Sequence, residues 1–219
     1  ARWFMLSDSP PERDLEWTDA GAEGAWRFGQ RVWRLVTEAT PQLTPSATPV
    51  PDSLGEVAGA ARRATHKAIL AVTDDIEKLR FNTAVAHIYE LTNTLSILNP
   101  AEEPGGPEVL REGLDALVRL FAPMMPHLAE EMWSLLGHDT LVADAPWPEG
   151  DPALLEQNTV TIAVQVGGKL RATLELERGL EQGLIEAAAL ADDKVQKAID
   201  GRAVRKVIIV PDKIVNVVV

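Results

Sequence analysis

The chain has 219 residues, a net charge of −12 at pH 7 and no cysteine. The lack of cysteine excludes disulfides and thiolate metal sites, and no apolar run approaches the roughly 20 residues that a membrane-spanning helix needs. Hydrophobic residues make up 46% of the chain and charged residues 25%, which is typical of a soluble globular protein with one large domain or two small ones.

The charge is unevenly distributed along the chain. From residue 158 onward there are nine Lys and Arg against eight Asp and Glu, so this part has a net charge of +1 and the remainder has −13. Such an acidic protein is not expected to coat nucleic acid with its whole surface. Any nucleic acid would have to be bound by local basic patches.

The first 40 residues combine a short apolar start with one long amphipathic helix. Residues 1–17 open without an initiator Met on Trp3 and Phe4 and continue as a proline-broken link, which predicts a helix remnant cut from a longer protein. Thr18 suits the N-cap of the next helix. The predicted core face of that helix has apolar residues three and four positions apart, namely Ala22, Ala25, Trp26, Gly29, Val32, Trp33 and Val36.

Loops and helices alternate in the middle of the chain. Four prolines within residues 38–52 predict a mobile loop. Ser53 predicts the N-cap of a helix that extends to Leu79, and Asn82 predicts the N-cap of a helix that extends to Leu98. Proline and glycine end this helix before a further apolar pattern begins at residue 110.

A proline corner follows at residues 117–133. The helical pattern reaches Phe121 and is then interrupted by Pro123 and Pro126, because proline donates no backbone hydrogen bond and clashes with the preceding turn. Pro126 suits the first turn of a new helix, which is expected to end at Gly137. These four or five helices with mostly short connections predict an all-α antiparallel helical bundle.

The hydrophobic period changes from helical to alternating after residue 157. Before this change, Trp147 between two prolines is predicted to hold a loop on the bundle, and residues 151–157 are predicted to be a linker. Two strands joined by a Gly167–Gly168 turn follow, then two short helices, the second capped by Asp192 or Asp193, and two more β-branched strands. The order ββααββ predicts a small α+β domain.

Metal-binding and catalytic signatures are weak. His127, Glu130 and Glu131 have a spacing that could touch one metal ion, but a di-iron bundle would need two such pairs and more carboxylates. The Gly168–Lys169 turn joins two strands and therefore does not form a phosphate loop. We predict no metal site and no catalytic residue in this chain.

Basic residues are the informative candidates for a functional surface. Some lie together on a helix face, and Lys169 and Arg171 alternate with Leu170, which predicts a shared sheet face. Such groups bind phosphates and position RNA without reading its sequence, or they are ordinary solvated surface residues. The candidate RNA-binding residues are Arg27, Arg31, Arg34, Arg62, Arg63, Lys67, Arg80, Lys169, Arg171, Arg202, Arg205, Lys206 and Lys213.

The proline corner from Leu117 to Trp133 resembles the APFxPHxxEExW corner in the helical tRNA-binding domain of class I aminoacyl-tRNA synthetases. The segments Arg80 to Ala84 and Ala145 to Pro148 occur in the same order as in that family. Three further segments are similar to bacterial leucyl-tRNA synthetases, at residues 9–17, 164–172 and 210–218. The resemblance covers nearly the whole chain.

The resemblance implies a multi-domain arrangement. It comprises the tail of a catalytic domain at 1–17, an anticodon-binding-type bundle at 18–150, the linker at 151–157 and a C-terminal tRNA-binding domain at 158–219. The parent enzyme is then expected to attach leucine to its tRNA with ATP and Mg²⁺, as a cytoplasmic monomer that does not bind membranes. This part is expected to dock tRNA and to contact the remainder of the synthetase chain.

The chain lacks the His-x-Gly-His and Lys-Met-Ser-Lys-Ser signatures with which this family binds ATP. We therefore predict that the chain needs no cofactor of its own and is inactive when isolated. Two alternatives stay open. One is the corresponding part of a valyl- or isoleucyl-tRNA synthetase, although the expected coiled coil or Cys-rich zinc site is not visible. The other is a non-enzymatic helical adaptor protein, against which the unfinished N-terminus argues.

Overall fold

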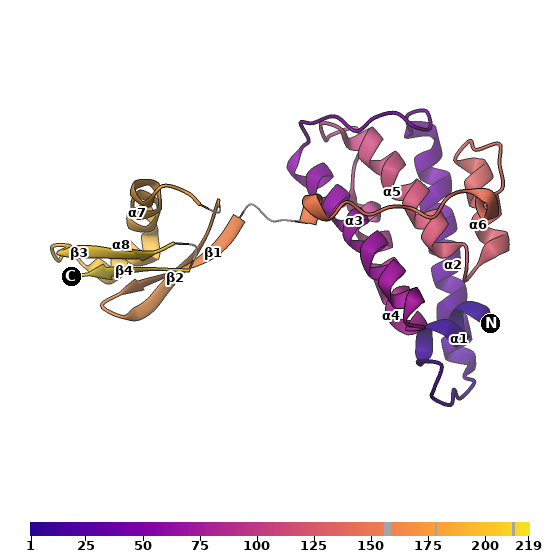
Figure 1. Ribbon diagram of the computed structural model, residues 1–219, viewed down its shortest axis with the longest axis horizontal. Coiled ribbons are helices and arrows are strands. Elements are labelled where there is room, and N and C mark those ends of the chain that lie inside the picture. Colours follow the sequence, from indigo (N-terminus) through magenta and orange to yellow (C-terminus); the bar gives the residue numbers. More distant parts are fainter. Residues whose placement is uncertain (156–158, 178, 212) are drawn as a thin grey trace. The chain divides into compact units, whose positions relative to one another are not determined.

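The computed structural model describes residues 1–155, 159–177, 179–211 and 213–219, with the backbone alone at 159 and 177 (Figure 1). The chain forms two compact units, Ala1–Leu155 and Glu156–Val219. The boundary lies inside the predicted linker, whose last residues, 156 and 157, are outside the described residues, as is residue 158. We describe each unit by itself.

The regular secondary structure of unit 1 is entirely helical. Its six α-helices are α1 (Arg2–Asp8), α2 (Asp19–Ala39), α3 (Glu56–Glu77), α4 (Phe81–Ile97), α5 (Gly106–Phe121) and α6 (Pro126–Leu135). Three 3₁₀ turns accompany them, η1 (Thr40–Gln42), η2 (Val142–Asp144) and η3 (Pro152–Leu155). The prediction of a helical bundle that breaks at the proline corner is confirmed, and Pro126 is the first residue of α6.

Two of the three predicted N-caps in this unit are wrong. Thr18 caps α2 as predicted, because its hydroxyl accepts a hydrogen bond from the Gly21 N–H at 3.2 Å. Gly55 precedes α3 instead of Ser53, and Arg80 precedes α4, so that Asn82 lies within the first turn of that helix. The side chain of Ser or Asn favours a cap but does not decide it when tertiary packing sets the helix start.

An aromatic cluster anchors α1 in the core of unit 1. The Trp3 ring stacks on Phe28 of α2 with centroids 5.0 Å apart and lies 4.9 Å from Phe121 of α5. Its indole N–H donates to the hydroxyl of Tyr89 on α4 at 3.3 Å. Trp3 is only 2% exposed, so α1 belongs to the bundle. The predicted boundary after residue 17 therefore does not coincide with a boundary between compact units.

The core face of α2 differs from the predicted one. Phe28, Gly29, Val32, Val36 and Ala39 are buried. By contrast Trp26 is 67% exposed and Trp33 is 36% exposed, so the prediction that both indoles face the core is wrong. The apolar stripe on α2 is wider than the surface that the bundle covers.

A buried arginine joins three parts of the bundle. Arg111 of α5 donates to the carbonyl oxygen of Thr44 at 2.9 Å and to that of Leu136 at 2.6 Å, and its guanidinium lies 3.3 Å from the Asp115 carboxylate. Asp115 also contacts His138 at 3.0 Å. The Pro-rich segment that we predicted to be a mobile loop is thus tied to α5, because one of its carbonyl groups pairs with a buried charge.

The described residues of unit 2 form one four-stranded sheet and two helices. Its elements follow as β1 (Thr159–Val166), β2 (Lys169–Glu177), α7 (Gln182–Ala191), α8 (Asp193–Ile199), β3 (Lys206–Val210) and β4 (Ile214–Val218). The strand order in the sheet is β2-β1-β4-β3, with β1 and β4 parallel and the other pairs antiparallel. Asp192 caps α8 as one of the two predicted alternatives.

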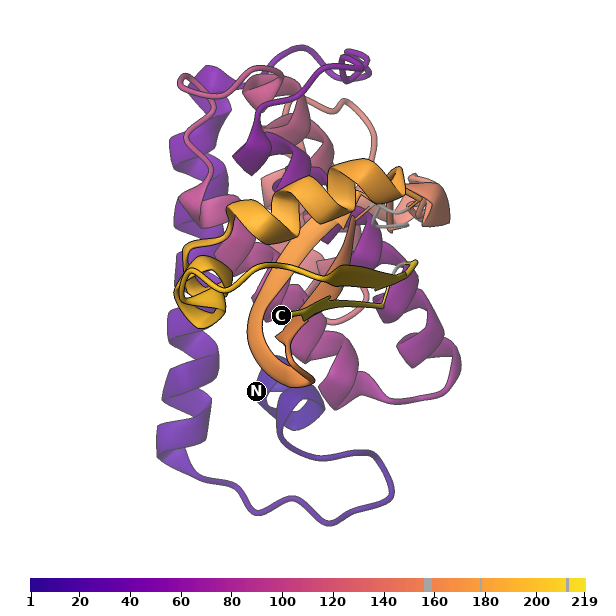
Figure 2. The ribbon, with the colours of Figure 1, turned by 90° about the vertical axis from the view of Figure 1, so that its left-hand side faces the viewer.

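One face of the sheet forms the core of unit 2. Residues such as Ile162 and Val164 of β1 and Val215 of β4 pack with Ile185 of α7 and Val195 of α8. The hairpin of β1 and β2, orange in Figure 2, curves strongly. Gly167 and Gly168 both have positive φ, +59° and +78°, which confirms the predicted two-residue turn.

The aromatic anchor of α1 can be tested by truncation. We expect Trp3→Ala to lower the free energy of unfolding of unit 1 by about 3–5 kcal/mol, because it opens a cavity between α2, α4 and α5. Met5→Ala, on the same helix but 51% exposed, should change it by less than about 0.5 kcal/mol. Urea unfolding of the 219-residue chain measures both, and equal effects would show that α1 is only loosely attached.

Candidate nucleic-acid interface

The three arginines of α2 differ in whether they pair with other side chains of unit 1. Arg27 pairs with Glu23 one turn earlier, at 2.9 Å, and both side chains are exposed. Arg31 donates to the side-chain oxygen of Asn93 on α4 and so links two helices. Arg34 is exposed and makes no ion pair with the described residues. Of the predicted stripe, Arg34 is therefore the residue most available to a phosphate.

The basic cluster on α3 is divided in a similar way. Arg62 Nε lies 3.1 Å from the Glu112 carboxylate of α5, whereas Arg63 and Lys67 are exposed. Glu112 also contacts Nε2 of the buried His66 at 3.3 Å. Burial acts to raise the pKa of Glu112, but the hydrogen bond with His66 and the charge of Arg62 outweigh it, so this pKa lies below its ordinary value. Arg62 thus serves the packing of α3 on α5.

Arg80 is engaged at the turn between α3 and α4. Its guanidinium contacts Asp74 and lies 2.7 Å from Asp75, which is buried. The hydrogen bond with Lys78, together with the charges of Lys78 and Arg80, lowers the pKa of Asp74. A buried carboxylate needs a partner, so this predicted RNA-binding residue has an internal role in the structure.

The Glu112 pairing predicts a specific pH dependence. Because the folded-state pKa of Glu112 is lowered, its stabilising effect is present above the unfolded pKa of about 4.3 and is lost as the pH falls through the folded value. We expect Glu112→Gln to be less stable than the unsubstituted chain by about 1–2 kcal/mol at pH 7, and the difference to shrink below about pH 4.

Denaturant unfolding between pH 7 and about pH 3 measures this difference. Glu131→Gln removes the same charge at an exposed position that makes no ion pair with the described residues, and it serves as the control. A Glu112→Gln difference that stays constant down to pH 3 would contradict the proposed pairing.

In unit 2, the sheet register brings four basic residues to one end of the sheet. Lys169 is opposite Val166 of β1, Val166 is beside Val217 of β4, and Lys206 is opposite Val218. Arg171 and Arg205 lie near the same end, where the N–H of Arg205 donates to the Val218 carbonyl at 2.8 Å. We call Lys169, Arg171, Arg205 and Lys206 the basic end of the sheet; all four are exposed.

The simple alternation predicted for Lys169 and Arg171 is wrong. The register shifts between Val164, which is opposite Ala172, and Gln165, which is opposite Leu170. Arg171 is therefore the extra residue of a β-bulge, and the alternation that placed it on one face with Lys169 is interrupted. The two residues lie at the same end of the sheet because of the register between β1 and β2. That register cannot be read from the sequence around residues 169–171.

Two other predicted cations of unit 2 lie apart from this end. The Arg202 guanidinium donates to the carbonyl oxygens of Ile199 at 2.9 Å and Ala198 at 2.7 Å, so it caps the last turn of α8. Lys213 precedes β4 and lies at the opposite end of the sheet, where β4 pairs with Val210. Arg202 therefore has a structural role, and Lys213 does not join the basic end.

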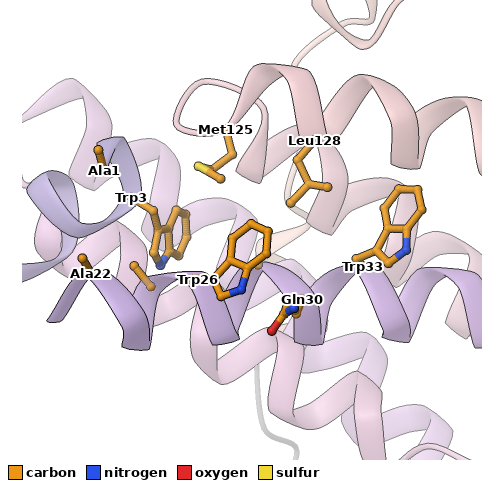
Figure 3. A pocket seen from close by; sticks show the side chains of 10 residues that line it. Ala1, Trp3, Ala22, Trp26, Gln30, Trp33, Met125 and Leu128 are labelled. Atoms are coloured by element: carbon orange, nitrogen blue, oxygen red, sulfur yellow. The ribbon is translucent and has the colours of Figure 1, made fainter. Parts of the chain in front are cut away.

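An apolar groove on unit 1 was not predicted. It measures about 420 Å³ and lies between α2, the start of α1 and the start of α6 (Figure 3). Trp26 and Trp33 of α2 point toward the side on which Met125 and Leu128 lie, and Gln30, between the two indoles in the sequence, also lines the groove. No Asp, Glu, Lys, Arg or His side chain lines the groove, which suits an apolar partner better than a phosphate. The sequence contained one sign of this groove. Phe28 lies beside the predicted stripe and widens the apolar face of α2, so the bundle covers only part of that face.

Within the part of the chain that the structure describes, no group of three or more His, Asp or Glu could hold a metal ion. The carboxylate of Glu130, a residue considered for such a site, instead accepts the N–H groups of Val142 and Ala143 at 2.8 and 3.2 Å. No helix among the described residues is long and apolar enough to cross a membrane.

Comparison with known families identifies the helical unit. The sequence profile described as "Anticodon-binding domain of tRNA ligase" matches residues 60–187, which is more than half of the chain and includes the proline corner. The chain belongs to this anticodon-binding family. The match begins within α3 and continues into unit 2 as far as α7, so the family comparison does not stop at the boundary between the two units.

Relatives of the anticodon-binding chain are leucine–tRNA ligases. Those of Parvibaculum lavamentivorans and Paramagnetospirillum magneticum are each 56% identical to it over 219 residues, 100% of this chain and 25% of the relative. The chain thus spans about a quarter of the length of the curated relatives that it matches. The predicted resemblance to leucyl-tRNA synthetases is confirmed.

A solved structure shows the same relationship. It is the ternary complex of LeuRS, tRNA and LeuAMS from Agrobacterium radiobacter K84. The match has 30% sequence identity and a TM-score of 0.72 and covers 99% of this chain and 28% of the solved chain. The identity is high enough to support the family assignment as well as the fold.

Proposed function

We propose that this chain is the tRNA-docking part of a leucine–tRNA ligase. The observation that carries the proposal is the 56% identity with such ligases along all 219 residues, through both units. A solved neighbour in complex with tRNA supports it. In this proposal unit 1 is a bundle of the class I synthetase anticodon-binding type, and unit 2 is a small α+β tRNA-binding domain of order ββααββ.

The activity itself belongs to the whole ligase in this proposal. The ligase joins leucine to its tRNA in the cytoplasm, as a monomer, and ATP and Mg²⁺ are bound outside this chain. The isolated chain is inactive because it carries neither ATP-binding signature. Its own contribution is to hold the tRNA so that the acceptor end reaches the rest of the enzyme.

Phosphate contacts are provided by local groups. Unit 1 is acidic overall, and Arg27, Arg31, Arg62 and Arg80 are engaged with side chains of the bundle. The basic end of the sheet in unit 2 has four exposed cations, two at each outer strand, β2 and β3, which are three strand spacings or about 14 Å apart. Such an arrangement suits separate phosphates of one RNA backbone, whereas Arg34, Arg63 and Lys67 are secondary candidates on the bundle.

The basic end can be tested in the full-length ligase with its tRNA. We expect Arg205→Ala/Lys206→Ala to weaken binding and to reduce the slope of log K against log salt by about 0.7–0.9 per lost phosphate contact. Lys194→Ala/Lys197→Ala removes the same charge from the exposed face of α8 and is the matched control. Arg202 is left unchanged because it caps α8.

Filter-binding titrations at several salt concentrations distinguish the two double variants. Leucine activation without tRNA should be unchanged in both, since surface substitutions rarely alter stability by more than about 0.5 kcal/mol. If the two double variants have the same affinity and the same salt slope, the basic end is an ordinary solvated surface.

We also propose that the apolar groove of unit 1 is covered by the remainder of the ligase. No charged side chain lines the groove, and Trp26 in it is 67% exposed. We expect Trp26→Gln to change the stability of the 219-residue chain by less than about 1 kcal/mol and that of the full ligase by about 2–3 kcal/mol, because the indole is buried only there.

Thermal unfolding of both proteins tests this prediction. Ile97→Gln, at an apolar position of α4 that is 75% exposed, is the control. Equal effects of Trp26→Gln in the two proteins would show that the groove stays open to solvent in the ligase.

A further inference from the structure

Residues 142–155, which we call the strap, return from α6 to α3 across unit 1. The strap is orange in Figure 1 and crosses α5 before η3. At its start the Glu130 carboxylate accepts the N–H groups of Val142 and Ala143. Further along, Arg119 of α5 donates to the Pro146 carbonyl oxygen at 3.3 Å, and Pro148 is buried. The strap is therefore bound along its length.

The end of the strap is bound by one face of α3. The indole N–H of Trp147 donates to the Thr73 hydroxyl at 2.8 Å, and the Asp151 N–H donates to Nδ1 of His66 at 2.9 Å. Residues 66, 70 and 73 are four and three positions apart, so they form one stripe on the helix. The predicted role of Trp147 in holding this loop on the bundle agrees with these contacts.

Gly150 lies against the middle of that stripe. A Cβ atom at this position would be 2.5 Å from Cγ of Leu70 and 3.1 Å from the carbonyl oxygen of His66. The second distance involves backbone and cannot be relieved by a rotamer change. Only glycine lets the strap approach α3 this closely, and the close approach allows the Asp151 N–H to reach the imidazole.

The hydrogen bonds of His66 define its tautomer. A backbone N–H is always a donor, so Nδ1 must be the acceptor, and the imidazole proton is on Nε2. Nε2 faces the Glu112 carboxylate at 3.3 Å, and Glu112 is also paired with Arg62. An imidazolium would place two donors, Nδ1–H and the Asp151 N–H, against each other. The bound strap therefore requires neutral His66 in the Nε2–H form.

We propose that His66 is a positioning residue that latches the strap to α3 and so fixes the point at which the chain leaves unit 1 toward unit 2. Thr159, the first described residue of unit 2, follows Leu155 by four positions. With the latch closed, the strap is held on α3 as far as Leu155, four positions before Thr159. With the latch open, the last held residue is Trp147, twelve positions before Thr159.

The consequence for RNA binding rests on the proposed function. An RNA that contacts both units binds the second one intramolecularly, at an effective concentration that falls as about the −3/2 power of tether length. Moving the last held residue of unit 1 from four to twelve positions before Thr159 triples this length, and overall binding is then expected to weaken by about fivefold. His66 contributes this factor without contacting RNA.

Hydrogen exchange on the 219-residue chain tests the latch without RNA. In His66→Asn the amide oxygen stands near the position of Nδ1 and can still accept the Asp151 N–H. In His66→Gln the amide stands near Nε2 and cannot. We expect the Asp151 amide to exchange at least tenfold faster in His66→Gln than in the unsubstituted chain, and to stay protected in His66→Asn.

Amides in the middle of α4 report whether each variant is folded. Gly150→Ala, which displaces the strap without touching the imidazole, should expose the same Asp151 amide and gives an independent route if His66→Gln does not fold. Equal protection in all variants, or an equal loss in His66→Gln and His66→Asn, would overturn the proposal.

Binding of tRNA to the full-length ligase tests the consequence separately. His66→Gln is expected to weaken affinity about fivefold, and His66→Asn much less. Unchanged affinity despite a freely exchanging Asp151 would show that the latch does not position unit 2 for RNA. If the unsubstituted ligase does not bind tRNA, the proposed function fails while the exchange result on the latch still stands.

Discussion

The buried guanidinium of Arg111 is the constraint on which the arrangement of unit 1 depends. A charge that is removed from water is costly unless its donors are paired, and Arg111 is paired with groups from three separate segments. These are the loop after α2, the end of α6, and Asp115 on its own helix. None of the three can shift alone without leaving a buried charge unsatisfied.

The same constraint determines where the strap begins. Asp115 contacts His138, whose ring stacks on Trp133 with centroids 3.5 Å apart. The chain after α6 therefore leaves from a fixed place, and it then meets Glu130, Arg119, Thr73 and His66 in turn. These polar contacts of unit 1 join secondary elements to each other. This explains why several arginines that looked like phosphate ligands are already occupied.

Local patterns in the sequence predicted most of the elements, because breaks, period and several caps depend on neighbouring residues; the caps expected at Ser53 and Asn82 are exceptions, because tertiary packing sets where α3 and α4 begin. Thr18, Pro126, Asp192 and the Gly167–Gly168 turn are in their predicted roles. The failures concern partners that are distant in sequence. Trp26 and Trp33 fit the spacing of an apolar helix face, but this spacing does not predict which part of the face is buried by the other helices. Similarly, Arg80 follows a helix whose Asp75 becomes buried only when α4 packs on it, and the bulge at Arg171 follows from pairing with β1.

The position of β4 has a consequence for the order of folding. β4 lies between β1 and β3, so the pair β2–β1 cannot join β3 in one sheet until residues 214–218 are present. Its parallel pairing joins Ala163 to Ile214, about fifty residues apart, and requires loop closure of that length, unlike the local antiparallel pairings of β1 with β2 and of β3 with β4. During synthesis the helices of unit 1 are complete well before this strand emerges. The bundle can therefore be folded while the small domain is still an open hairpin with unpaired edges, the stage at which a sheet is most exposed to association with other chains.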